Sequence, residues 1–378
     1  MKTPEGWERV RLKEVIEENR KSAFKVEDAD NEGKYPFFTS GDNILTHIVY
    51  LVDGENLFLS TGGTAYINYY SGKASYSADT YSVKSKIDTK YLYYFILGKI
   101  DYITFSFFIG SGLEHLQKGD LKNSFEIIFP ESISEQSKIA EILSAVDDAI
   151  DKTEALIQKY QRVRQGLMQD LLTKGIDENG SIRDEKAHKF KNSSLGRIPE
   201  EWEVVELWEV FRLKSGETKP SDTSLYGKYP VYGGNGILGH TNRLNFDIET
   251  LIIGRVGEYC GIVHIANKGW VTDNALYVIT KRRNYYNQFF YYLLRYLTLN
   301  QYSAETGQPL MTQSIIYRLK VPFPPLPEQH RIAQILSQID ETIKIELQYK
   351  QKLLAIKRGL MEDLLTGTVR VNHLIEDN

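Results

Sequence analysis

One block of this chain occurs twice, and this repeat constrains the fold more than any other feature. Residues 135–173 and 328–366 align without a gap at a shift of 193 positions, and 18 of the 39 positions are identical. Both copies open on E-Q-x-x-I-A-x-I-L-S and close on G-L-M-x-D-L-L-T. Because such copies fold alike, we expect the chain to be two copies of one structural plan. Its function then needs two similar parts held at a set distance.

The repeated block is predicted to form a long helix. Its apolar and small residues recur at alternating steps of three and four, the pattern of a coiled coil. Ser132 with Glu135 fits a capping box, Pro327 suits a first helical turn, and Gly175 and Gly367 lie just beyond the ends. About 39 helical residues extend roughly 58 Å, which suits a spacer. We expect the two helices to pack antiparallel, related by a pseudo-twofold axis.

The helix positions assigned to the spacer and to partner contacts combine the periodic residues with a matched pair of glycines. They are Ile139, Ile142, Val146, Leu156, Tyr160, Val163, Gly166 and Leu167 in the first copy, and Ile332, Ile335, Ile339, Tyr349, Leu353, Ile356, Gly359 and Leu360 in the second. A glycine inside a helix costs roughly 1 kcal/mol against alanine. Close helix approach, a partner contact or chance would each account for the two glycines.

The segments that precede the helices also correspond. Residues 4–15 match residues 199–210, Y-P-F-F-T-S-G-D-N-I-L near 35 parallels Y-P-V-Y-G-G-N-G-I-L near 229, and Ser77–Tyr81 parallels Val271–Ala275. Each half contains short β-like runs and a tyrosine-rich amphipathic stretch, which begins at Lys90 or Gln288. These patterns predict two mixed α/β domains of ordinary size.

We therefore expect an α+β fold in which two mixed α/β domains are separated by two long antiparallel helices. The expected segments are a first domain (1–132), a first helix (133–173), a polar linker (174–198), a second domain (199–325), a second helix (326–366) and a tail (367–378) that frays.

The composition favours a reducing compartment. Cys260 is the one cysteine, so no disulfide framework is expected. The chain shows no apolar run long enough to cross a bilayer and no basic, apolar signal peptide at its start. We expect a cytoplasmic protein without membrane association.

No catalytic motif stands out. Residues 234–239 read G-N-G-I-L-G, but a dinucleotide site also needs a strand before the glycines and a helix after them, and a turn-like stretch follows here. Cys260 and His264 lie four residues apart, and two ligands do not make a zinc site. Neither a Walker loop, nor a G-x-S-x-G elbow, nor the motif of adenine-N6 methyltransferases is present. We expect no catalytic residue, no metal and no cofactor.

The remaining signal is for nucleic-acid binding. A formal net charge of −4 counts against it, because a strongly basic domain is the usual footprint. However, basic residues, Lys118 and Lys268 among them, gather in the loops of the two domains, whereas acids concentrate in the helices and the linker. Basic groups beside Asn, Ser, Thr and Tyr in glycine-rich loops can hold phosphate and read base edges.

Arg255 is the strongest single candidate because glycines flank it in Gly254–Gly257. The matching stretch of the first half, Ser60–Thr64, lacks the arginine, so the two halves should read different chemistry. The candidate DNA-binding residues are Lys21, Lys25, Lys34, Ser40, Asn43, Thr61, Thr64, Lys73, Lys214, Lys219, Lys228, Tyr232, Asn235, Arg243, Arg255, Asn274, Arg282 and Arg283.

Over nearly its full length the chain resembles the specificity subunit of a type I restriction–modification system. The resemblance rests on the duplicated helix, on P-F-P-P-L-P-E-Q at 322–329, on F-K-N-S at 190–193 with G-R-I-P-E-E-W at 196–202, and on Y-P-V-Y-G-G-N-G at 229–236 with W-V-T-D at 270–273. The first half departs from it, because it starts at Pro4-Glu5-Gly6-Trp7 without the F-K-x-S segment and lacks the proline-rich run before its helix.

This resemblance implies a function and partners. Such subunits are not catalytic, and each of two target-recognition domains reads one half of a bipartite, asymmetric target in double-stranded DNA. The paired helices set the spacer between the halves and hold two adenine-N6 methyltransferase subunits, and motor–nuclease subunits join for restriction. S-adenosylmethionine, ATP and magnesium belong to those partners. The alternative is a coiled-coil scaffold that pairs two ligand-binding domains without touching DNA. Base choice depends on loop geometry and water, so the target sequence and spacer length are left to experiment.

Overall fold

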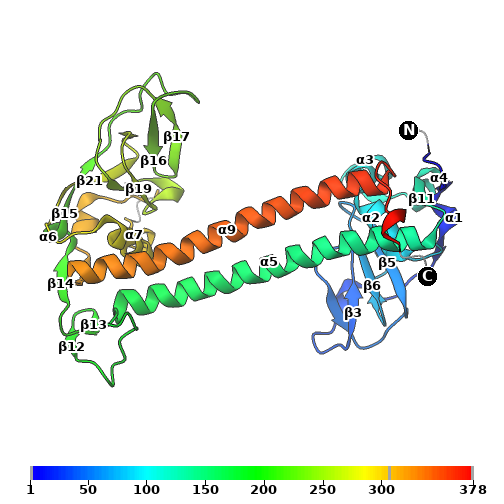
Figure 1. The fold of residues 1–378 in the computed structure, drawn as a ribbon, viewed down its shortest axis with the longest axis horizontal. Coiled ribbons are helices and arrows are strands. Elements are labelled where there is room, and N and C mark those ends of the chain that lie inside the picture. Colours follow the sequence, from blue (N-terminus) through cyan, green and yellow to red (C-terminus); the bar gives the residue numbers. More distant parts are fainter. Residues whose placement is uncertain (1–2, 305–307, 376–378) are drawn as a thin grey trace. The chain divides into compact units, whose positions relative to one another are not determined.

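The computed structural model describes residues 3–304 and 308–375 and divides into two compact units (Figure 1). The first unit contains residues 1–155 and 348–378, and the second contains residues 156–347. Each unit therefore combines one domain with segments of both long helices, α5 (Ile133–Thr173) and α9 (Leu326–Leu365). Both helices predicted from the repeat are present.

The larger sheets of the first unit have four strands and three strands. Their strands are β2 (Ile16–Glu18), β3 (Tyr35–Phe38), β4 (Leu45–His47), β5 (Glu55–Ser60), β6 (Ile67–Ser71), β7 (Ser75–Tyr76) and β8 (Thr80–Ser85). The strand orders are β2-β8-β5-β6 and β4-β3-β7. Neighbours are antiparallel except for β3 and β7, which are parallel.

The second unit repeats this arrangement. Its strands are β15 (Phe211–Ser215), β16 (Tyr229–Gly233), β17 (Gly236–Thr241), β18 (Thr250–Gly254), β19 (Val263–Ala266), β20 (Trp270–Val271) and β21 (Ala275–Lys281). The orders are β15-β21-β18-β19 and β17-β16-β20, again with one parallel pair, β16 and β20. The G-x-G-x-x-G string at 234–239 thus covers the tip of the β16–β17 hairpin and the first residues of β17, and it opens no helix.

The remaining elements complete the two domains. The tyrosine-rich stretches are α2 (Thr89–Leu97) and α7 (Asn287–Tyr296), and short ribbons pair β1 (Trp7–Arg11) with β11 (Glu126–Pro130) and β14 (Glu203–Glu206) with β22 (Lys320–Phe323). The other elements are α1 (Leu12–Val15), α3 (Ile100–Phe107), α4 (Lys118–Ser124), α6 (Leu207–Val210), α8 (Gln313–Tyr317), β9 (Phe108–Ile109), β10 (His115–Leu116), β12 (Phe190–Ser193), β13 (Gly196–Pro199) and the 3-10 helices η1 (Val26–Asp28), η2 (Gly257–Tyr259), η3 (Leu299–Tyr302) and η4 (Asn372–Leu374).

One expected correspondence is wrong by a single residue. Ser77 donates its backbone N–H to Phe38 at 2.9 Å, and Thr272 donates to Tyr232 at 2.9 Å, so Ser77 matches Thr272 and not Val271. Asp79 accordingly matches Asn274. The two segments share too few identities for sequence to fix the register, whereas the backbone hydrogen bonds fix it directly.

The buried core of each unit joins its four-stranded sheet and amphipathic helix to the ends of both long helices. In the first unit the cluster includes Leu57, Tyr91, Ile139 and Leu365. In the second it includes Ile253, Phe289, Leu171 and Ile332. Each long helix is thus anchored mainly by its contact with a domain.

Within each unit, the segments of α5 and α9 pack antiparallel. Asp147 pairs with Lys357 and Glu154 with Lys350 in the first unit, and Arg164 pairs with Asp340 in the second. Each step to a later residue of α5 is matched by an equal step to an earlier residue of α9, as antiparallel helices require. The repeat shift carries Asp147–Lys357 onto Asp340–Arg164, so the ion pair between the two helices is duplicated, with one copy in each unit.

Three residues expected on the helix seam are exposed instead. Val163, Tyr349 and Ile356 are 42%, 49% and 51% exposed, while Ile157, which the pattern missed, is 2% exposed. A strict seven-residue repeat drifts around a straight helix by about 20° per heptad, so late positions rotate away from the partner. Nothing described would meet a Cβ at Gly166 or Gly359, which excludes close helix approach as their cause.

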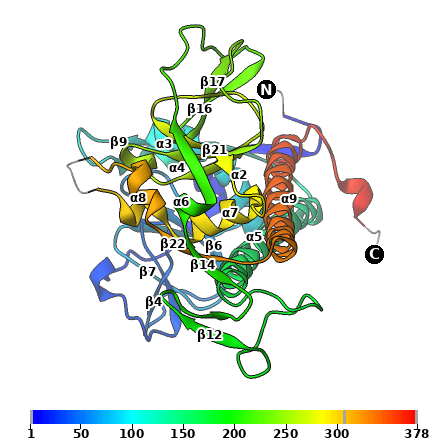
Figure 2. The same cartoon turned by 90° about the vertical axis from the view of Figure 1, so that its left-hand side faces the viewer.

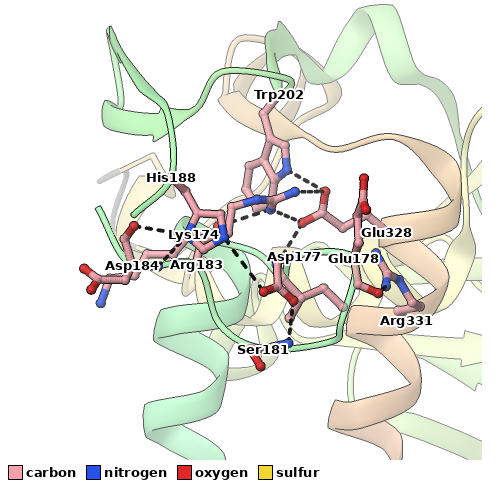
Figure 3. Close-up of polar contacts among 11 residues, drawn as sticks. Lys174, Asp177, Glu178, Ser181, Arg183, Asp184, His188, Trp202, Glu328 and Arg331 are labelled. Carbon is pink, nitrogen blue, oxygen red and sulfur yellow. Dashed lines mark hydrogen bonds and ion pairs between the residues drawn. The ribbon is translucent and has the colours of Figure 1, made fainter. Parts of the chain in front are cut away.

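A buried ion pair joins the start of α9 to the segment after α5 (Figure 3). Both carboxylate oxygens of Glu328 accept hydrogen bonds from the Arg183 guanidinium. Glu328 also accepts from the Trp202 indole at 2.9 Å and from the backbone N–H of Ile176 at 2.9 Å. We call Glu328, Arg183 and Trp202 the second clasp. Ser132 caps α5 through the backbone N–H of Glu135, but the Glu135 side chain does not complete a capping box.

That side chain instead belongs to an equivalent first clasp in the first unit. Glu135 accepts from Arg370 at 2.7 and 2.8 Å, and the Arg370 guanidinium lies 5.9 Å from the ring centroid of Trp7. The hydrogen bond with Glu135 raises the pKa of Arg370, so the guanidinium stays protonated. The expectation of a frayed tail is therefore wrong for residues 367–375, since Arg370 is bound and Val371 is 3% exposed. Residues 376–378 of the tail and residues 1–2 lie outside the described residues.

The expected linker 174–198 is also ordered. Ile176 is 1% exposed within the core of the second unit, Arg183 joins the second clasp, and β12 pairs with β13 in a hairpin. Figure 2 shows this hairpin with β14, α7 and the start of α9. Sequence reasoning took the polar composition for a linker because the few buried groups are widely spaced.

Within residues 3–304 and 308–375, no helix is long and apolar enough to cross a membrane.

The glycines beyond and within α5 give opposite predictions for stability. Gly175 has a φ of +65°, and an added Cβ would lie 2.2 Å from a Glu328 oxygen and 2.4 Å from the Trp202 ring. We expect Gly175→Ala to destabilise the protein by about 2 kcal/mol or more, since left-handed backbone strain and the clash add. Gly166→Ala, at an open helical site, should stabilise it by roughly 1 kcal/mol. Thermal denaturation monitored by circular dichroism compares the two, and equal shifts would contradict the clasp as a close-packed site.

Candidate nucleic-acid interface

In the first domain, three loops meet where β3 and β5 end and β8 begins. The Thr61 hydroxyl donates to the backbone carbonyl of Asp79 at 2.7 Å, and the Ser40 hydroxyl donates to the same carbonyl. The backbone N–H of Thr61 donates to the Ser40 hydroxyl at 3.1 Å. The structure therefore brings together two of the predicted DNA-binding residues, Ser40 and Thr61.

The second domain places equivalent loops together. The backbone N–H of Arg255 donates to the Asn274 carbonyl at 2.9 Å, as that of Thr61 does to the Asp79 carbonyl at 3.2 Å. Gly234 takes the place of Ser40, and Asn235 beside it is exposed. Arg255, Asn274 and Asn235 were all predicted from the sequence, and they lie on adjoining turns.

A fourth segment completes both sites. Leu116 donates its backbone N–H to the Thr61 carbonyl at 3.0 Å, and Met311 donates to the Arg255 carbonyl at 2.8 Å. Two residues further along, Lys118 and Gln313 hold equivalent positions. We name Lys21, Ser40, Thr61, Asp79 and Lys118 the first turn cluster. The second turn cluster comprises Ser215, Arg255, Asn274, Thr312 and Gln313.

The first turn cluster carries its positive charge on two lysines. Lys118 is half-buried, with its ammonium 5.2 Å from the Tyr81 ring centroid. Burial lowers the pKa of Lys118, and the charge of nearby Lys21 lowers it further, against the opposing pull of Glu18 and Asp79. Lys21 was a predicted site residue, whereas Lys118 had only been one of several loop lysines. No sequence signal separates it from them, because its neighbours come from distant segments.

The second turn cluster carries its charge on Arg255. The side chain is partly buried and lines a pocket of about 330 Å³ together with Ser215, Thr312, Gln313 and Ser314. Its Nε is buried and has no hydrogen-bond partner among the described residues. Gln313 was not anticipated, since an amide in T-Q-S has no distinguishing pattern. The equivalent turns thus present different chemistry, as the comparison of Ser60–Thr64 with Gly254–Gly257 predicted.

Both domains also place two lysines over tyrosine rings, over two different rings in the first domain and over Tyr229 alone in the second. The ammonium of Lys34 lies 6.0 Å from the Tyr35 ring centroid, and that of Lys228 lies 5.2 Å from the Tyr229 ring centroid. Lys73 lies 4.6 Å from the Tyr50 ring centroid and Lys268 lies 5.7 Å from that of Tyr229. Lys34 of the first domain corresponds to Lys228 of the second, and Lys73 corresponds to Lys268, beside the same strands of the two three-stranded sheets. We call them the lysine–tyrosine pairs.

Several predicted residues lie apart from the turn clusters. Arg282 and Arg283 follow the far end of β21 from Asn274, and Arg282 stacks on Phe323 at 4.8 Å and pairs with Glu203 at 3.4 Å. Arg243 pairs with Asp222 at 3.7 Å. Tyr232 packs its ring against the buried cluster around Phe246. Five further predicted residues lie at exposed loop or strand positions, namely Lys25, Asn43, Thr64, Lys214 and Lys219.

Among residues 3–304 and 308–375, no three or more His, Cys, Asp and Glu side chains gather as a possible metal site. The arrangement offers surface turns with hydroxyl, amide and cationic groups, which suits recognition of a ligand by contact.

The fold and the turn clusters together define a protein with two copies of one binding domain, each packed on segments of two long helices. A family model described as the type I restriction modification DNA specificity domain matches residues 4–161 and again residues 199–355. The chain therefore belongs to this family and contains two copies of its domain.

Individual relatives cover almost the whole chain. The MjaVIII specificity subunit of a type I restriction enzyme from Methanocaldococcus jannaschii is 28% identical, covering 99% of this chain and 95% of the relative. The EcoDI specificity subunit from Escherichia coli is 26% identical over 89% of this chain and 82% of its own length. A crystal structure of the type I restriction-modification S subunit from M. genitalium has the same fold, with a TM-score of 0.71 at 19% identity over 95% of this chain and 96% of that one.

Proposed function

We propose that this chain is the DNA-specificity subunit of a type I restriction–modification system and reads a bipartite, asymmetric target in double-stranded DNA. The observation that carries the proposal is the paired occurrence of the DNA specificity domain, with different side chains at equivalent turns. Two copies of one frame with unlike turns suit a target whose two halves differ in sequence.

The features shared by the two domains suit contacts to the phosphate backbone, which is the same in both halves of a DNA target. Phosphates position a protein without specifying sequence, and base edges specify. The lysine–tyrosine pairs recur in both domains, so we assign them to phosphate contacts. The turn clusters differ between the domains, so we assign them to base contacts. The net charge of −4 fits if partner subunits supply further phosphate contacts.

Catalysis then resides in partners, namely two adenine-N6 methyltransferase subunits and the motor–nuclease subunits that join for restriction. The methyl donor, ATP and magnesium would belong to those subunits. One support is the naming of the relatives as specificity subunits. Another support is a solved structure whose description concerns complex assembly of the type I restriction–modification system. That structure has this fold, with a TM-score of 0.55 at 15% identity.

Exposed apolar side chains on the long helices offer surfaces for such partners. In the first unit, an open groove of about 580 Å³ is lined by Phe95, Ile128, Leu354, Met361 and Leu365. The equivalent groove of the second unit holds about 200 Å³, because Leu195 and Arg197 of the β12–β13 hairpin line it as well. The first groove lacks such a cover among the described residues, so we propose it as a methyltransferase contact.

The first test exchanges one domain. Replacing residues 1–132 with the corresponding domain of another family member should change one half-site and leave the other half-site and the spacer unchanged, because each domain reads one half. Sequencing of methylated adenines in a host that carries the chimera gives both half-sites directly. A change in both halves would contradict independent reading.

A second test lengthens the helices. Seven residues inserted after Ala155 and seven before Tyr349 keep the register set by the Glu154–Lys350 pair. They extend each helix by about 10 Å, so the preferred spacer should grow by up to about three base pairs with unchanged half-sites. Insertion into α5 alone serves as the control, since it breaks the helix register and should lower thermal stability. Altered half-site bases in the doubly extended protein would refute the ruler.

The groove gives a third test, which also addresses the scaffold alternative. Leu354 is 43% exposed, so Leu354→Glu should leave the fold intact while reducing recovery of the methyltransferase in affinity purification from the host. Gln348→Glu adds the same charge to the same helix without removing an apolar side chain and should keep full recovery. If the unaltered chain were recovered without any methyltransferase, the scaffold reading would replace the proposed function.

A further inference from the structure

The backbone on both sides of Arg255 is held in place. Its N–H donates to Asn274, and its carbonyl accepts from Met311. Gly254 before it has no room for a side chain, since a Cβ there would lie 2.0 Å from the Tyr259 carbonyl oxygen. Gly257 has a φ of +69°, a left-handed conformation that favours glycine. The Arg255 side chain therefore projects from a rigid turn.

The guanidinium on this rigid turn has no partner among the residues that the structure describes. No hydrogen bond or ion pair joins it to any residue of 3–304 or 308–375, and its Nε is buried. A guanidinium carries five N–H donors, and a buried donor without an acceptor is costly. Other arginines near the domain surface are paired, such as Arg243 with Asp222 and Arg282 with Glu203. Arg255 is thus arranged for an acceptor that arrives from outside.

The neighbours of Arg255 favour a base over a phosphate. Thr312, Gln313 and Ser314 line the same pocket and supply both donors and acceptors, whereas a phosphate offers acceptors alone. The equivalent residue in the first domain is Thr61, which has no charge. Both halves of a DNA target carry the same phosphates. A contact present in one domain only is therefore better suited to reading a base than to holding a phosphate.

We propose that Arg255 reads a guanine in the half-site of the second domain, with its fork of donors on the O6 and N7 acceptors and Gln313 beside it on the neighbouring base. Arginine to these two guanine atoms is the commonest specific side-chain contact in the major groove. This assignment rests on the proposed function and adds the base class and the residue that selects it.

The test compares methylated motifs from hosts that carry the full complex with the unaltered chain, with Arg255→Ala or with Arg255→Lys. In both variants one guanine of the second half-site should become degenerate, with preference over other bases falling roughly 5- to 150-fold, the usual value of a bidentate contact. Lysine should not restore it, because an ammonium lacks the planar fork. The first half-site and the spacer should stay unchanged.

Matched variants make the outcome decisive. Arg282→Ala removes an arginine from the other end of β21 and should leave both half-sites intact. Lys118→Ala should alter the first half-site only. The affinity of each purified complex for defined DNA, measured over a salt series, shows whether Arg255 contacts a phosphate instead of a base. If Arg255→Ala weakened binding equally for all sequences and lowered the salt slope by about one, Arg255 would be a phosphate contact and the proposal would be overturned. Lack of any methylation motif with the unaltered chain would instead overturn the proposed function.

Discussion

The buried glutamates at the starts of the two long helices hold this structure together. Glu328 ties the start of α9 to Arg183 beyond the end of α5, and Glu135 ties the start of α5 to Arg370 beyond the end of α9. Removing one partner of a buried ion pair costs about 3–5 kcal/mol, because the other charge is left unpaired. Each clasp also includes a tryptophan near the start of the domain. The Trp202 indole donates to Glu328, and the Arg370 guanidinium lies over the ring of Trp7. In each unit the clasp thus joins the start of one long helix to the segment beyond the other and to the start of the domain.

The difference between residues that hold the fold together and residues at the turn clusters explains which parts of the repeat remain alike. The glutamine after each clasp glutamate is buried as well, and Gln136 and Gln329 each donate to a backbone carbonyl just before the helix, at 2.7 and 2.9 Å. Tyr94 and Tyr292 donate to Asp147 and Asp340, at 2.8 and 2.9 Å, on the two helices. These side chains serve packing and geometry, so both copies need the same residues. The turn clusters lie at loop surfaces where packing imposes little, and their residues differ.

Sequence alone predicted the elements that depend on local pattern. The repeat gave both helices, and Gly175 and Gly367 marked their ends because a left-handed residue is needed there. Ser40, Thr61, Arg255 and Asn274 were predicted, and the structure brings each pair together. Contacts between distant segments were not predictable. Glu135 looked like half of a capping box and is a buried ion-pair partner, residues 174–198 looked like a linker and are ordered, and Lys118 and Gln313 became visible only through backbone pairing.

The exposed seam residues connect helix physics to assembly. Val163, Tyr349 and Ile356 keep the apolar period but are exposed. Two straight helices bury one narrow strip each, whereas the apolar period of these sequences sweeps round the helix by about 20° per heptad. An apolar stripe wider than one partner covers is expected where further helices pack alongside. The residues that sequence reasoning assigned jointly to the spacer and to partner contacts therefore separate in the structure. Buried Ile139 and Ile332 belong to the cores of the two units, and the exposed residues are left for the methyltransferase subunits of the proposed complex.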